Sequence, residues 1–139
     1  MVRVSEGGCL CGAVRYRIEG EPIVSVTCQC RSCRRASGAA LVPWLHLDSQ
    51  RLSFTAGQPV AFESSPEVTR TFCGRCGTPL TYRRTDYGPA IDVTTCSLDD
   101  PDAFPPVLHV WASHALGWLE LADDLPRFDE TPRAKSLCG

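Results

Sequence analysis

The pattern of apolar and polar residues along the chain is that of short β-strands. Between Ala13 and Glu19, valine, tyrosine and isoleucine alternate with arginine, arginine and glutamate. Successive side chains of a strand point to opposite faces, so this alternation predicts one buried and one solvent-facing side. Comparable short segments predict further strands at Ile23–Thr27, Ala39–Leu45, Leu52–Thr55, Val60–Glu63, Val68–Phe72, Leu80–Arg83, Ile91–Thr95, Leu108–Trp111 and Trp118–Leu121.

Turn-forming residues separate most of these segments, and helical periodicity is weak throughout. Many short strands joined by frequent turns predict a mainly β domain. The best helix is a short one around Arg31–Ser37, and Asp99–Asp102 could cap another short turn. We expect a single domain over residues 1–139. The tail after Asp123 is polar and contains proline, so we expect it to be loosely attached, chiefly beyond about residue 129.

Composition narrows the class of protein. An apolar content of 43% and a charged content of 22% are typical of a soluble globular chain. No stretch approaches the roughly 20 apolar residues that cross a bilayer, and Met1–Gly8 lacks the apolar core of a signal peptide. We therefore expect a cytoplasmic protein with no membrane partner. A net charge of −2 argues against a nucleic-acid partner.

The cysteines carry the most specific information in the chain. Seven of the nine fall into three clusters, Cys9-x-Cys11, Cys28-x-Cys30-x-x-Cys33 and Cys73-x-x-Cys76. Thiols stay reduced in the cytoplasm, so clustered cysteines there indicate metal binding or catalysis rather than disulfides. Structural zinc takes four protein ligands, whereas catalytic zinc keeps one position open.

Two of the clusters supply two thiolates each, which together complete a four-cysteine zinc site. In Phe72–Thr78 a glycine follows each cysteine, so the backbone can curl and turn its N–H groups toward the sulfurs. The alternative is two buried free cysteines. The pair Cys9 and Cys11 needs a bent turn, because alternate strand residues face opposite sides. Joining these clusters would pin the first strand to the middle of the chain and stabilise a small β domain.

The third cluster supplies three thiolates, one short of a closed shell. Three thiolates and a zinc ion leave one net negative charge, which suits a soft fourth ligand such as a substrate thiol better than it suits hydrolysis. Three arginines, Arg31, Arg34 and Arg35, lie beside it in the sequence and could offset the charge or hold a carboxylate. The alternative is that Cys96 or another cluster closes the shell, which would make this site structural.

The remaining candidate residues favour packing over chemistry. We expect His109, in an apolar segment, to be a hydrogen-bonded core residue rather than a ligand, and His46 and His114 to be surface or packing residues. The three tryptophans could line a pocket, although core packing is the default. We interpret Cys138, next to the C-terminus, as an incidental free thiol.

Together these motifs identify a resemblance. The chain resembles the glutathione-dependent formaldehyde-activating family, which shares its domain with centromere protein V. The resemblance rests on the ordered set Gly8-Cys-Leu-Cys-Gly12, Cys28-Gln-Cys-Arg-Ser-Cys-Arg34, Phe72-Cys-Gly-Arg-Cys-Gly77, Ser97-Leu-Asp-Asp-Pro101, His109-Val-Trp111, Trp118-Leu-Glu-Leu121 and Leu125-Pro-Arg-Phe128.

The resemblance implies a fold, two metal sites and a reaction. The implied fold is an Mss4-like β-tent of short antiparallel strands with two zinc ions per chain. It implies a structural zinc on Cys9, Cys11, Cys73 and Cys76, and a second, catalytic zinc on Cys28, Cys30 and Cys33. The implied chemistry forms or breaks the hemithioacetal between a thiol and an aldehyde, glutathione and formaldehyde being the family's namesake pair.

The leading hypothesis is therefore a cytoplasmic zinc enzyme, a carbon–sulfur lyase acting on a small thiol or its aldehyde adduct. The second zinc would act as Lewis acid and template, while Arg34 or Arg35 orients a substrate carboxylate. The competing hypothesis is a non-catalytic zinc-binding or interaction domain with a closed second shell.

Overall fold

Two β-sheets form the framework of the computed structural model, which describes residues 1–131. The smaller sheet is antiparallel and has the order β1 (Val4–Gly8), β2 (Arg15–Glu19), β5 (Leu52–Ala56). The larger sheet has the order β10 (Leu108–Val110), β3 (Val24–Cys28), β4 (Val42–Asp48), β9 (Ala90–Thr94), β8 (Pro79–Arg84), β7 (Val68–Phe72), β6 (Val60–Ser65). Within it β10 pairs in parallel with β3, and the other neighbours are antiparallel. The mainly β fold predicted from the sequence is confirmed.

Short helices connect the strands. The α-helix α1 (Arg31–Ser37) follows β3 directly, and its bounds are those predicted. It ends at Gly38, whose φ of 70° lies in the left-handed region that glycine adopts without strain. Short 3₁₀ turns complete the list: η1 (Ser49–Arg51), η2 (Thr85–Tyr87), η3 (Thr95–Ser97), η4 (Pro101–Ala103) and η5 (Ala112–His114).

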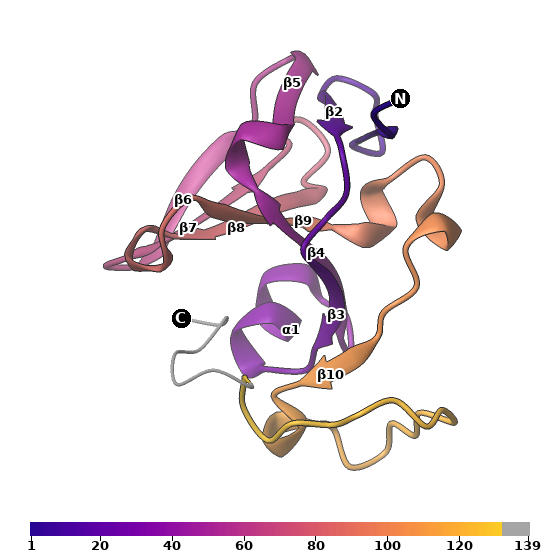
Figure 1. Cartoon of the computed structure of the whole chain (residues 1–139). Helices are drawn as coiled ribbons and strands as arrows, with labels where there is room; N and C mark the ends of the chain where they lie inside the picture. The colour runs from indigo at the N-terminus through magenta and orange to yellow at the C-terminus, as the bar shows by residue number, and fades with distance from the viewer. Residues whose placement is uncertain (132–139) are drawn as a thin grey trace.

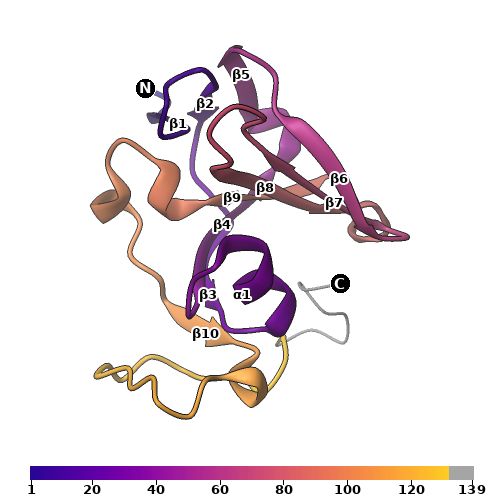
Figure 2. The same cartoon turned by 180° about the vertical axis from the view of Figure 1, so that it is seen from behind.

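The two faces of the larger sheet carry different cores. Strands β2 and β5 lie near one end of the molecule, while α1 lies beside β3 and β10 near the other (Figures 1 and 2). Strand β4 serves both cores, because Leu45 and Leu47 pack with Tyr16 and Ile18 of β2, whereas its buried Trp44 packs beneath α1. The alternation predicted for β2 therefore corresponds to one buried face, which packs in the core that contains Leu45 and Leu47.

The structure corrects three strand assignments, the first being β4, which runs from Val42 to Asp48 where Ala39–Leu45 was predicted. Val4–Gly8 forms β1, although its polar, glycine-containing sequence carries no alternation signal. Trp118–Leu121 is not a strand, and Trp118 is 74% exposed. The physical reason is that the outer side of β10 is already taken: His109 donates its N–H to Pro126, and Phe128 donates its N–H to His109.

The same contacts correct the expectation of a loose tail for residues 126–130. Backbone hydrogen bonds run from Trp111 to Glu130, from Ala112 to Phe128 and from Ser113 to Asp129. The chain is therefore tied to β10 and η5 up to residue 130, and in Figure 1 this yellow segment runs beside β10. The rest of the predicted tail, including Cys138, lies outside the described residues.

Among the residues that the structure describes, no helix has the length and apolar character needed to cross a membrane.

Candidate metal centres

The first cysteine pair lies on the turn between β1 and β2. Cys9 donates its N–H to Val14 and accepts one from Gly12 at its carbonyl, and Gly12 has a φ of 80°. This positive φ gives the turn the bend that the sequence demanded, since glycine has no Cβ to oppose it. The sulfurs of Cys9 and Cys11 consequently lie 3.7 Å apart.

The second pair lies on the turn between β7 and β8 and meets the first. The Sγ atoms of Cys11 and Cys73 are 3.8 Å apart, although 62 positions separate them in the chain. The sulfurs of Cys9, Cys11, Cys73 and Cys76, hereafter the four-cysteine site, lie within 4.8 Å of one another. The structure thus brings the two clusters together, and their residues could hold a metal ion.

Backbone N–H groups turn toward these sulfurs, as the glycines in Phe72–Thr78 predict. The sulfur of Cys73 accepts from the N–H groups of Arg75 and Cys76, each at 3.4 Å, and the sulfur of Cys9 accepts from Val14 at 3.2 Å. Such donors stabilise thiolates and orient them as ligands.

The pKa values of Cys76 and Cys11 indicate why the site suits a cation. The Thr78 hydroxyl and backbone N–H lower the pKa of Cys76 to about 5. Although the Ala13 N–H favours the thiolate of Cys11, partial desolvation and the neighbouring sulfurs raise the pKa of Cys11 to about 11. Four sulfurs this close therefore do not all ionise unaided, whereas a soft divalent cation would balance their charge. The donor set fits zinc.

The third cluster forms where β3 ends and α1 begins. Cys28 is the last residue of β3, Cys30 is the N-cap of α1, and Cys33 lies on its first turn. The sulfur of Cys30 accepts the Cys33 N–H at 3.3 Å, so it also caps the helix. The three sulfurs, hereafter the three-cysteine site, lie within 4.8 Å of one another, and all three residues are buried. This donor set, too, fits a soft cation such as zinc.

Cys96, the residue suspected of closing this shell, does not join it. It is exposed on η3. Within residues 1–131, no further cysteine, histidine or acidic ligand atom belongs to the group formed by the three sulfurs. The described part of the chain therefore supplies three protein ligands here, against four at the other site.

A cavity of about 650 Å³ adjoins the three-cysteine site. Helix α1 contributes Cys33 and Arg35 to its wall, and the larger sheet contributes Trp44, Phe62 and Arg70. Trp44 thus lines a pocket while also packing in the core, so both sequence interpretations hold for this residue.

The arginines predicted beside the site have different environments. Arg34 donates from Nε to the Gln29 carbonyl at 3.2 Å and from Nη2 to the His114 carbonyl at 3.2 Å. These bonds hold η5 against α1, so part of its guanidinium already has protein partners. Arg35 is exposed and lines the cavity. Arg31 is exposed, and its backbone N–H donates to His114 Nδ1 at 3.5 Å.

Sequence reasoning missed Arg70. Its Nη2 atom lies 4.0 Å from the Sγ atom of Cys33, and its guanidinium lies over the ring of Tyr82, 4.8 Å from the centroid. The signal was present in the alternation of β7, where Arg70 shares the face of the buried Val68. An arginine at an inward position of a strand is rarely buried without a partner or a function.

Arg70 belongs to a polar row that crosses the sheet. Arg70 pairs with Tyr82, Tyr82 with Asp92, and Asp92 with His46 in the registers of β7, β8, β9 and β4. Directly paired residues share a face, so all four point to the side covered by α1. The Nδ1 atom of His46 lies 2.6 Å from Asp92. Burial raises the pKa of Asp92, and the nearby Cys33 adds to this rise.

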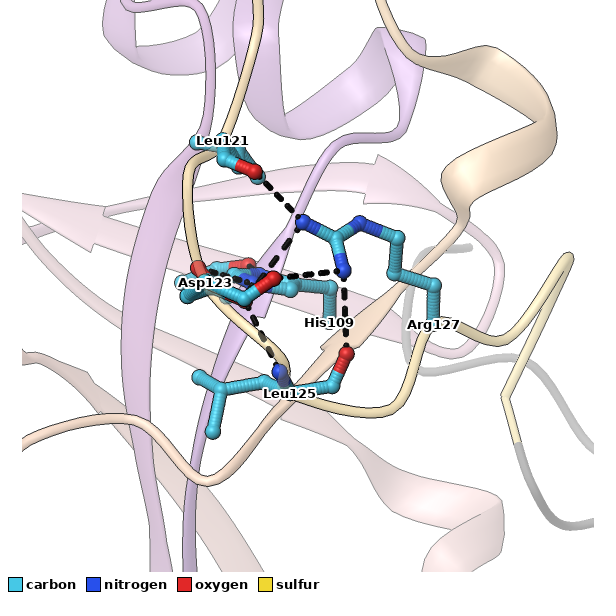
Figure 3. A network of polar contacts seen from close by, with 6 residues as sticks. His109, Leu121, Asp123, Leu125 and Arg127 are labelled. Carbon is cyan, nitrogen blue, oxygen red and sulfur yellow. Dashed lines mark hydrogen bonds and ion pairs between the residues drawn. The ribbon is translucent and has the colours of Figure 1, made fainter.

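The predicted role of His109 as a hydrogen-bonded core residue is confirmed. It is 2% exposed, its Nδ1 contacts the hydroxyl of Thr27, and its Nε2 lies 3.0 Å from the carboxylate of Asp123. Figure 3 shows Arg127 and the Leu125 N–H converging on the same carboxylate. This network holds the C-terminal segment against β10. His109 pairs with Thr27, the residue before Cys28 at the end of β3.

Comparison with known proteins supplies the family. The family model described as glutathione-dependent formaldehyde-activating enzyme matches residues 4–114, from β1 to η5. The chain belongs to this family. The match includes both cysteine sites, the cavity wall named above and His109, and it ends at His114. Members of the glutathione-dependent formaldehyde-activating family are associated with glutathione-linked formaldehyde chemistry, and the recognition made from the sequence motifs is confirmed.

A solved structure supports the fold of this family member. A crystal structure of a Rhodobacter sphaeroides protein, a structural genomics target, aligns with a TM-score of 0.54 and 18% identity. The alignment covers 88% of this chain and 98% of that protein. At this identity the likeness concerns the fold alone. A search of curated proteins finds no significant match.

Proposed function

We propose that this protein is a zinc-dependent carbon–sulfur lyase that acts on a thiol–aldehyde adduct of the S-hydroxymethylglutathione type. The proposal includes two zinc ions per chain, one at each cysteine site, and a single domain over residues 1–139 of the Mss4-like tent type. The family membership supports a reaction of this class, and the geometry of the three-cysteine site supports our assignment of the reaction to that site.

One observation carries the proposal. The three-cysteine site has three sulfurs within 4.8 Å and lies against a cavity through Cys33. A metal with three protein ligands and an adjoining cavity has room for an outside ligand, as catalytic zinc sites do. The four-cysteine site already has its full set of protein ligands, which is the arrangement of a structural zinc.

The reaction requires little rearrangement. In the breakdown direction the C–S bond of the adduct breaks, its electron pair stays on sulfur, and the hydroxyl carbon becomes the aldehyde carbonyl. The hydroxyl proton moves to the released thiol, so atoms and charge balance. A zinc ion at this site would supply a Lewis acid and a template for sulfur. The reverse reaction joins thiol and aldehyde in the same geometry.

The protein's own residues contribute binding, charge and shielding. Cys28, Cys30 and Cys33 would hold a zinc ion where β3 ends and α1 begins. The cavity wall includes the apolar side chains of Val42, Trp44 and Phe72. These side chains limit the access of water to the reacting carbon. The side chain of Arg35 offers positive charge at the exposed side of the cavity.

The test is the rate of exchange between free formaldehyde and its glutathione adduct, measured by exchange NMR spectroscopy. Because the uncatalysed addition is already fast, the quantity to compare is the exchange rate above that of protein-free buffer. We expect this excess to rise in proportion to zinc-loaded protein. We expect it to vanish in Cys30→Ser and to persist in Cys96→Ser, which changes a cysteine outside both sites. No excess rate with fully zinc-loaded wild-type protein would overturn the proposal.

A further inference from the structure

We propose that Arg70 is the specificity-determining residue of the cavity and selects thiols that carry a carboxylate. The inference rests on the proposed function, because it assumes that a thiol enters the cavity beside the three-cysteine site. In this inference the substrate carboxylate binds chiefly to Arg70 on strand β7, and not to the arginines of α1.

The burial of Arg70 is the first observation. Arg70 is only 9% exposed, and no other lysine or arginine is among the buried residues in the part of the chain that the structure describes. Within that part no ion pair joins Arg70 to a carboxylate. A buried cation is costly unless a negative partner compensates it. One such partner is the sulfur of Cys33, and a second can come from a ligand.

The direction of the guanidinium is the second observation. It is held by the Tyr82 ring on one side, with its centroid 4.8 Å away, and its Nη2 atom points to the Cys33 sulfur at 4.0 Å. Arg70 also lines the cavity. The planar guanidinium carries five N–H donors, so those not directed at Cys33 remain for a ligand in the cavity.

The charge of the cavity wall is the third observation. Among the described residues that line it, two are cationic, Arg35 and Arg70, and none is acidic. Opposite Arg70 across the β6–β7 pair lies Phe62, which is 60% exposed and also lines the cavity. A wall that combines apolar side chains with two cations suits an organic anion.

The arginines of α1 are less suited to selection. Arg34 spends donors on the carbonyls of Gln29 and His114, and it is not among the described residues that line the cavity. Arg35 is exposed, and an exposed ion pair contributes little because water and salt screen it. Arg70 is buried beside the sulfur cluster, where a charge-assisted, two-pronged bond to a carboxylate is strong.

The experiment compares matched thiols by calorimetric titration of zinc-loaded protein. The probes are 3-mercaptopropionate, 2-mercaptoethanol and glutathione, with zinc content measured before and after each titration. For wild type we expect the carboxylate-bearing thiols to bind more tightly than 2-mercaptoethanol. In Arg70→Gln we expect them to weaken by about tenfold to hundredfold, as for loss of a hydrogen bond to a charged group, while 2-mercaptoethanol is unchanged.

An unchanged affinity for 2-mercaptoethanol distinguishes two roles of Arg70: binding a thiol's carboxylate, and supporting the metal site itself. If Arg70→Gln weakens all three thiols equally or loses its zinc, and Arg70→Lys does the same, Arg70 supports the sulfurs and the inference is overturned. Preference for carboxylates that survives in Arg70→Gln but is lost in Arg35→Gln also overturns it. If wild-type protein with zinc at both sites binds none of the thiols, the proposed function fails and the inference fails with it.

Discussion

The Nη2 atom of Arg70 lies 4.0 Å from the Sγ atom of Cys33, although 37 positions separate the two residues in the chain. This contact joins β7 to α1, the helix that carries Cys33 of the three-cysteine site. Both residues line the cavity, so the contact lies where the three-cysteine site meets that cavity. The positive charge beside the sulfurs can offset the net negative charge that three thiolates leave on a divalent metal.

The first prediction concerns metal content. Protein purified without chelators should contain two zinc ions per chain, because the sulfurs form two separate groups. Elemental analysis against protein concentration measures this ratio. A folded protein with no zinc would contradict the assignment of both sites. One zinc ion per chain is compatible with the assignment only if Cys30→Ser also contains one. The three-cysteine site would then bind zinc more weakly and lose it during purification.

The second prediction separates the two sites by their effect on stability. Cys73→Ser should lower the free energy of unfolding by at least ~5 kcal/mol, since structural zinc contributes ~10–16 kcal/mol in small zinc-binding peptides. The reason is that Cys73 joins two turns far apart in sequence. Cys30→Ser should cost much less, because its site is local and serine can replace cysteine as N-cap of α1.

Thermal and urea unfolding of the purified variants measure the difference. Cys96→Ser is the matched control, because Cys96 is exposed and outside both sites, and it should change stability by less than about 0.5 kcal/mol. Equal destabilisation by Cys30→Ser and Cys73→Ser would show that the three-cysteine site is structural, contrary to the proposed function.

Much of this architecture could be predicted from local sequence signals. The bounds of α1 and β7 agree with the prediction, and the two-cysteine clusters combine as their spacing indicated. These features depend on neighbouring residues or on ligand number, both of which a single sequence contains.

The missed features depend on contacts between distant segments. Val4–Gly8 becomes a strand because it pairs with the strongly patterned β2, not because of its own sequence. Trp118–Leu121 has the composition of a strand, but residues 126–128 occupy the place beside β10. Arg70 looked like one of many strand arginines until the register brought it to Tyr82 and the helix packing brought it to Cys33.

The third prediction is a pH dependence carried by Asp123. The Leu125 N–H, together with His109 and Arg127, holds the pKa of Asp123 below its ordinary value, which is about 3.9. A carboxyl with a lower pKa in the folded state contributes stability that is present above its unfolded pKa and is lost as the pH falls through the folded pKa. Asp123→Asn should therefore melt at a lower temperature than wild type at pH 7, and this gap should close below about pH 4.

The measurement is the difference in melting temperature between the two proteins at each pH, so that acid effects common to both cancel. Asp124→Asn is the control, because Asp124 is an exposed neighbouring aspartate, and it should melt close to wild type at pH 7. A gap between wild type and Asp123→Asn that stays constant from pH 7 to pH 3 would contradict the prediction.

The fourth prediction concerns His109. Replacing its ring by Phe keeps the apolar packing but removes the contacts to Thr27 and Asp123. We expect a loss of about 1–3 kcal/mol of unfolding free energy, the cost of leaving buried polar groups without partners. Hydrogen exchange should also accelerate at the Phe128 N–H, which bonds to the His109 carbonyl.

Urea unfolding and amide exchange test this directly. His114→Phe is the comparison variant, since His114 is less buried and its ring packs on Trp111; it should cost less than His109→Phe. If His109→Phe leaves both stability and the Phe128 exchange rate at wild-type values, the network does not hold the C-terminal segment.

Cobalt substitution tests whether the three-cysteine site accepts a thiol from outside. Cobalt bound at both sites gives thiolate-to-metal absorption, and a further sulfur ligand increases it. Titration with glutathione should raise this absorption in wild type and in Cys96→Ser, but not in Cys30→Ser, which lacks the site. An unchanged spectrum in wild-type protein with cobalt at both sites would show a closed shell and contradict the account.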